Sequence, residues 1–143
     1  MQKCLYYWLL SIGGGHVVLG VALALGGQSS LLAPYFDNLL SQFGLHTAGA
    51  ETRLLAQTLI QLLGPTVASW GLLFGCLVYL YRRHAEALIK LGIFAALLLW
   101  LPLDCLISAS HGLYWQVYLN LGVGLLIGLP LALLKPQQAQ LSR

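Results

Sequence analysis

The hydrophobic pattern of this chain consists of four long apolar stretches separated by shorter polar segments. Each stretch reaches or exceeds the ~20 residues that a helix needs to cross the ~30 Å hydrocarbon core of a bilayer. Because lipid offers no hydrogen-bond partner to a bare peptide group, each stretch should be helical throughout. The sequence therefore predicts an all-α integral membrane protein. We expect one transmembrane domain over residues 1–143, a four-transmembrane-helix bundle with spans at residues 5–25, 54–81, 88–107 and 113–134.

The connection between the first two spans has a helical pattern of its own. Apolar residues recur with a period near 3.6, Asp37 and Asn38 occupy the other face, and Gly44 is a plausible stop. A helix of about three turns is too short to cross a bilayer and should lie in the interface. We predict an outer amphipathic helix at about residues 30–43, whose lipid-facing or bundle-facing residues are Leu32, Phe36, Leu39 and Phe43.

Composition agrees with a membrane protein and excludes several other classes. Hydrophobic residues make up 59% of the chain and charged residues only 8%, whereas soluble domains carry about 25% charged residues. The three cysteines form no C-x-x-C pair and predict neither a disulfide framework nor a metal site. No nucleotide-binding fingerprint, metal cluster or nucleophile triad is present, so we expect no cofactor and no nucleic-acid partner.

The basic residues predict the orientation of the bundle. Of the seven Lys and Arg residues, only Arg53 lies on the side that holds the connection between the first two spans. Because cytoplasmic loops carry an excess of Lys and Arg, we expect both termini and the 82–90 turn in the cytoplasm, with a bacterial inner membrane as the location. The residues on the predicted cytoplasmic side are Lys3, Arg82, Arg83, Lys90, Lys135 and Arg143.

Polar side chains within the spans indicate where a functional site could lie, because each is costly there and usually faces protein or water. In this orientation, five of them from three helices share the outer half of the membrane, which favours a common pocket over chance scatter. The inner half is nearly all Leu, Val, Ala and Gly, which argues against a channel. The predicted ligand-binding residues are His16, Gln57, Gln61, Trp100, Asp104, Gln116 and Asn120.

Each of these residues also has a purely structural interpretation. Gln and Asn in spans often only join helices, through hydrogen bonds worth ~0.6 to 2 kcal/mol each. Asp104 lies near the outer boundary and can simply meet water, and His16 can pack against a neighbour while bonded to a backbone carbonyl. Gly20, with Gly124 and Gly128, favours close helix packing. Both interpretations stay open at this point.

Short motifs within this arrangement carry a similarity to known membrane proteins. They are Trp8-Leu9-Leu10 before His16, Gln57-x-x-x-Gln61 before Pro65, Leu99-Trp100-x-Pro102-Leu103, and Asn120 ahead of Pro130. On these residues, and on the order of its spans, the chain resembles the EXPERA family, which includes the sigma-two receptor and the emopamil-binding sterol isomerases. The resemblance implies a bundle with a site for a sterol-like or other amphipathic molecule.

The chain also departs from the pattern of that family. Gln57 stands where the family has an acid, Asp104 is the only acid on the third span, and Val123 replaces the tryptophan that follows the asparagine. Sterol isomerisation needs a proton donor and an acceptor around a cation-like transition state. The substitutions therefore favour binding over catalysis.

We thus expect a non-enzymatic protein that binds a membrane lipid, a sterol-like molecule or another amphipathic small molecule. One alternative is an accessory subunit that packs against a larger membrane protein or a second copy of the chain. The other alternative is an EXPERA-like isomerase that uses Asp104 and His16 as acid and base.

Overall fold

The computed structural model describes residues 1–45 and 49–137, and within these residues it is built almost entirely from helices. Four of the helices are long and apolar enough to cross a membrane, which confirms the predicted four-span integral membrane fold. A short 3₁₀ turn and a fifth helix follow the first span, where the amphipathic pattern predicts a helix. The elements are α1 (Gln2–Gly26), η1 (Ser30–Leu32), α2 (Ala33–Gln42), α3 (Ala50–His84), α4 (Ala87–Ser110) and α5 (Tyr114–Leu133).

The long helices run a few residues past the apolar stretches and end at recognisable turns. Ala85 adopts a left-handed conformation with φ of 61°, and its backbone N–H donates to the carbonyl of Tyr81 at 3.1 Å. This turn ends α3, and α4 begins two residues later. Gly44 and Gly112 also have positive φ, which glycine adopts without a steric penalty, at the turns after α2 and α4. The predicted stop at Gly44 is confirmed.

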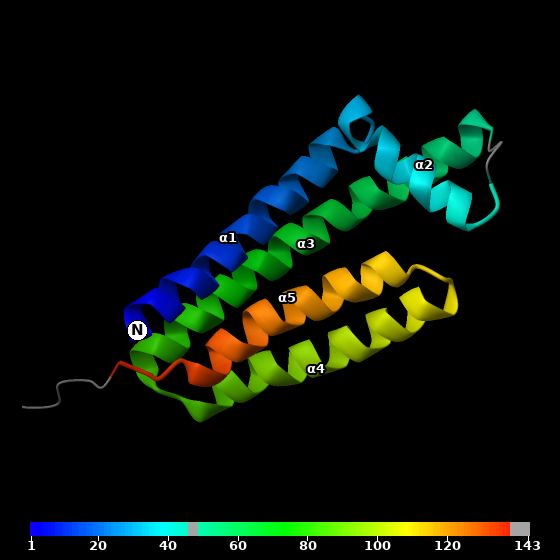
Figure 1. Cartoon of the computed structure of the whole chain (residues 1–143). Helices are drawn as coiled ribbons and strands as arrows, with labels where there is room; N and C mark the ends of the chain where they lie inside the picture. The colour runs from blue at the N-terminus through cyan, green and yellow to red at the C-terminus, as the bar shows by residue number, and fades with distance from the viewer. Residues whose placement is uncertain (46–48, 138–143) are drawn as a thin grey trace, which may run out of the picture.

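The four spans form two antiparallel pairs, α1 with α3 and α4 with α5 (Figure 1). The pairs meet where α3 contacts α4 and α1 contacts α5, and α2 packs against α3. We call the end that holds residue 1 and the α3–α4 turn the terminal end, and the opposite end the α2 end. In Figure 1 the two pairs lie close together at the terminal end and diverge toward the α2 end.

The main hydrophobic core lies in the terminal half of the bundle and joins all four spans. Its largest fully buried side chains include Leu9 of α1, Val78 of α3, and Ile127 and Leu131 of α5. Ile93 and Leu97 of α4 complete the contact between the pairs. The full cluster is Leu9, Phe74, Val78, Tyr81, Ile93, Leu97, Ile127, Leu131 and Leu134.

Glycines bring the backbones of α1 and α3 together. Four buried glycines, two on each helix and seven residues apart, form what we call the glycine seam. They are Gly13 and Gly20 on α1, and Gly64 and Gly71 on α3. A Cβ atom on Gly71 would lie 2.6 Å from the carbonyl oxygen of Gly13, and one on Gly20 would lie 2.8 Å from the Cα of Ala68. Small residues allow this approach, which maximises van der Waals contact between membrane helices. The expectation that Gly20 serves close packing is therefore confirmed.

The basic residues of the terminal end stabilise the C-terminal end of α5. Lys90 donates from Nζ to the carbonyl oxygens of residues 132 and 134 at 2.9 and 3.1 Å. Arg82 donates to the carbonyl of residue 135 at 2.7 Å, and the Gln2 amide donates to that of residue 133 at 3.1 Å. The last carbonyls of a helix lack intrahelical donors and carry partial negative charge. These side chains therefore cap α5 and tie it to the other three spans.

Candidate functional site

The helix α2 covers the α2 end of the bundle with its apolar face. Phe36 is 0% exposed and Leu40 is 7% exposed, whereas Asp37 and Asn38 are exposed. Phe43, which the periodicity places on the apolar face, is 49% exposed, and its ring lies 5.6 Å from that of His111. The amphipathic pattern is thus confirmed at its centre, and Phe36 anchors the helix.

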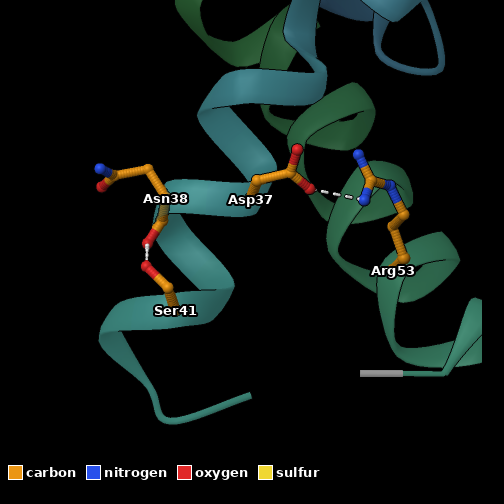
Figure 2. A network of polar contacts seen from close by, with 4 residues as sticks. All are labelled: Asp37, Asn38, Ser41 and Arg53. Atoms are coloured by element: carbon orange, nitrogen blue, oxygen red, sulfur yellow. Dashed lines mark hydrogen bonds and ion pairs between the residues drawn. The ribbon is translucent and has the colours of Figure 1, made fainter. Parts of the chain in front are cut away.

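A salt bridge links α2 to the start of α3. The Arg53 guanidinium contacts the Asp37 carboxylate at 2.7 Å, while the Asn38 side chain points away from α3 (Figure 2). The two paired side chains are 36% and 63% exposed. An ion pair with this exposure contributes about 1 kcal/mol or less. The salt bridge therefore orients α2, and burial of Phe36 provides most of the attachment.

An aromatic contact connects α2 to the first turn of α5. The rings of Tyr35 and Trp115 meet edge to face with centroids 6.1 Å apart. Tyr35 is half-buried, and this burial raises the pKa of its phenol above the ordinary value of 10.0. The hydroxyl is therefore neutral at physiological pH and can act as a hydrogen-bond donor.

Two side-chain amides, Gln116 and Asn120, form what we call the amide pair on α5. The Gln116 Nε2 donates to the Asn120 Oδ1 at 3.5 Å, a long hydrogen bond. Asn120 is only 3% exposed, and its Nδ2 is the one buried side-chain nitrogen or oxygen without a hydrogen-bond partner among the described residues. Leaving such a donor unpaired costs about 1 to 3 kcal/mol. Asn120 therefore offers a strong donor to any acceptor that reaches it.

Asp104 of α4 lies at nearly the same level as the amide pair. Leu101 of α4 packs on Gly124 of α5, and Leu97 lies next to Gly128. Because the two helices are antiparallel, four residues forward on α4 correspond to four residues back on α5. Residue 105 is therefore level with Asn120. Asp104 is half-buried, and within residues 1–45 and 49–137 its carboxylate has no cationic group within ion-pair distance. The α4–α5 pair therefore places a carboxylate and a free amide donor at a similar level in the α2 half.

Two of the predicted site residues engage the α1–α3 pair instead. Gln61 donates from Nε2 to the carbonyl oxygen of Ala24 on α1 at 3.4 Å. The His16 Nδ1 lies 2.8 Å from the carbonyl oxygen of Ile12, and its ring lies 4.8 Å from that of Trp70. These contacts match the structural interpretation, in which polar side chains join or pack helices.

The remaining predicted residues have less defined surroundings. Gln57 is half-buried on α3, one turn closer to the α2 end than Gln61, and Trp100 is 38% exposed on α4. The convergence of all seven residues in one pocket stays a prediction. Ser108, absent from the predicted set, is 3% exposed. Ser108 lies one helical turn after Asp104, and this spacing could have placed it on the same face as Asp104 from the sequence alone.

The geometry offers no obvious centre for metal chemistry in the described part of the chain. No three His, Cys, Asp or Glu side chains gather there in an arrangement that could hold a metal ion. What the α2 half presents is a half-buried acid, a buried amide donor and an apolar cover. Comparison with protein-family models, with curated proteins and with solved structures gives no match for this chain.

Proposed function

We propose that the protein binds a membrane lipid, a sterol-like molecule or another amphipathic small molecule in the α2 half of its bundle. The unpaired Nδ2 of Asn120 carries this proposal, since a buried donor without a partner is costly and is best explained by an acceptor on a ligand. Asp104 and the amide pair would contact the polar group of the ligand. Its apolar part would contact the apolar side chains around these groups.

The amide pair suits ligands of more than one polarity. As arranged, it offers an N–H donor to a carbonyl, hydroxyl or phosphate oxygen. If both amides rotate by half a turn, Asn120 donates to the Gln116 oxygen and its own oxygen becomes the free acceptor. A hydroxyl group could bind to either arrangement. Asp104 adds a charge-assisted contact for a cationic group.

The apolar surroundings of these polar groups are typical of small-molecule binding sites. Such sites are mostly apolar, with a few polar groups that orient the ligand. The main core fills the terminal half, and Phe36 is fully buried at the α2 end. The resemblance to the EXPERA family points to the same class of ligand. With Gln57 in place of an acid, binding is favoured over isomerisation.

We also place both termini in the cytoplasm of a bacterial cell, so that the site faces the outer leaflet of the inner membrane. A chain without its native cysteines, carrying either Asn38→Cys or Glu86→Cys, tests this orientation; both positions are exposed. An impermeant maleimide should label position 38 in intact cells and position 86 only after lysis. Labelling of position 86 from outside would reverse the proposed topology.

Replacing Asn120 by leucine tests the site itself. The change removes an unpaired buried donor, so the melting temperature in detergent should stay equal or rise. Binding of a neutral fatty alcohol should weaken by about 5- to 150-fold, the equivalent of about 1 to 3 kcal/mol for a buried polar group that loses its partner. Native mass spectrometry of the purified protein would report the retained ligand. Asn38→Leu, the same change on an exposed residue, is the control.

Asp104→Asn removes the negative charge from the same site while keeping a side chain of nearly the same size. A long-chain amine should lose about tenfold or more in affinity, because only this ligand forms a charge-assisted hydrogen bond of about 1.5 to 3 kcal/mol. The matched alcohol should change little. Equal binding by wild type, Asn120→Leu and Asp104→Asn would contradict the proposed function.

A further inference from the structure

A second feature, on the outside of the α1–α3 pair in the terminal half, is an apolar groove with a volume of about 450 Å³. Gly14 of α1 and Gly75 of α3 contribute to its lining, together with Leu72, Cys76, Tyr79 and Leu80. A Cβ atom on either of these two glycines would meet no other atom within 4 Å. Unlike the glycine seam, they are therefore not needed for packing within the chain. Their missing side chains leave space at the surface.

The face of α3 that lines the groove continues beyond it to a basic residue. Leu72, Cys76, Tyr79 and Arg83 follow one another at intervals of four, three and four residues, so they share one face of the helix. At 1.5 Å per residue, the distance from Leu72 to Arg83 is about 16 Å. This is close to half of the ~30 Å hydrocarbon core. With Arg83 at the interface, this face of α3 would reach about the middle of the bilayer.

A basic group stands at the interfacial end of the groove. The Arg83 Nη1 donates to the hydroxyl oxygen of Tyr79, a groove residue, at 2.9 Å. Arg83 is exposed and forms no ion pair among the described residues, whereas the neighbouring Arg82 donates to the backbone of residue 135. A guanidinium group presents several N–H donors in a fork that matches phosphate oxygens. The mouth of the groove is thus suited to an anion.

We propose that this groove binds one acyl chain of an anionic glycerophospholipid, whose phosphate contacts Arg83. An acyl chain matches the apolar lining of the groove and the length of the α3 face that leads to Arg83. The phosphate supplies the negative partner for the Arg83 guanidinium. A helix from a second copy of the chain would fit the glycines, but its terminal end carries one acid, Glu86, among several basic residues and so suits Arg83 less well. The groove lies in the opposite half of the bundle from Asn120, so this lipid site does not depend on the proposed function.

Filling the groove tests the assignment. Gly75→Leu adds a side chain at a groove position where a Cβ atom meets nothing within 4 Å. Gly15→Leu is the matched control, because a Cβ atom there is equally free but Gly15 is outside the groove lining. Each variant would be reconstituted in vesicles of phosphatidylcholine and phosphatidylglycerol, extracted gently and measured by native mass spectrometry. We expect wild type and Gly15→Leu to retain phosphatidylglycerol, and Gly75→Leu to lose most of it.

Arg83→Gln removes the charge while leaving the groove open. It therefore tests the proposal even if Gly75→Leu destabilises the protein. This variant should retain phosphatidylcholine and phosphatidylglycerol in proportion to the vesicle, with the preference for the anionic lipid lost. Unchanged retention of phosphatidylglycerol in both Gly75→Leu and Arg83→Gln would overturn the proposal. So would a wild-type dimer that Gly75→Leu converts to a monomer, since the groove would then hold a second copy.

Discussion

Replacing Gly20 by leucine should destabilise the protein by about 3 kcal/mol or more, at the upper end of the range for overpacked sites. A Cβ atom at this position would lie 2.8 Å from the Cα of Ala68 and even closer to the carbonyl oxygen of Gly64. Both are backbone atoms of α3, which cannot move aside as a flexible side chain can. The helices α1 and α3 must separate to admit the new side chain. Thermal unfolding in detergent, followed by far-UV circular dichroism, measures the loss.

Gly15→Leu is the control for this change, because a Cβ atom at Gly15 meets nothing within 4 Å. Both substitutions replace a glycine in the same helix by the same residue, so any gain in helix propensity is shared. Only the variant at Gly20 should lose stability. Equal melting temperatures for the two variants would mean that α1 and α3 do not pack through the glycine seam.

Replacing Phe36 by aspartate should detach α2 from the bundle, at a cost of more than about 3 kcal/mol. Removing a buried phenylalanine side chain alone costs about 3 to 5 kcal/mol, and a carboxylate at a fully buried position adds a desolvation penalty. Phe36 is 0% exposed. Hydrogen exchange followed by mass spectrometry should show lost protection over residues 33–42. Lipid retained at the α2-end site should fall as well.

Phe43→Asp provides the comparison, since Phe43 belongs to the same predicted face but is 49% exposed. It should change the exchange of α2 and the melting temperature only slightly. If Phe36→Asp behaved in the same way, the burial of α2 against the bundle would have to be abandoned.

Hydropathy and helical periodicity were sufficient to predict the four spans and the amphipathic helix. Both signals are local, because a bilayer acts on every stretch of the chain in the same way. Phe36 and Asp37 could be assigned to opposite faces for the same reason. Leu40, a second buried anchor, lies one turn after Phe36 on the same apolar face, whereas Phe43 at the end of that face is 49% exposed. Local periodicity therefore identifies a face but not how deeply each of its residues is buried.

The pairing of the helices could not be predicted in this way. Gly20 was identified as a packing residue, but its partner Gly64 lies on another helix, and nothing in either span alone specifies that contact. The same limit applies to the polar residues. Gln61 and Asn120 look equivalent as amides in apolar spans, yet the first donates to a carbonyl of α1 and the second keeps a free donor. Tertiary contacts, which depend on all four helices, make this distinction.

The caps on α5 have a consequence for the order in which the protein is completed during synthesis. Chains emerge from the ribosome N-terminus first, and early segments can begin to fold before later ones are made. The neighbours α1 and α3 can pair before α4 appears. The carbonyls of residues 132–135, however, accept hydrogen bonds from Gln2, Arg82 and Lys90, one residue from each earlier span. The last residues of the fourth span and those just after it thus close the bundle, and a nascent chain halted before them would hold its helices without this final attachment.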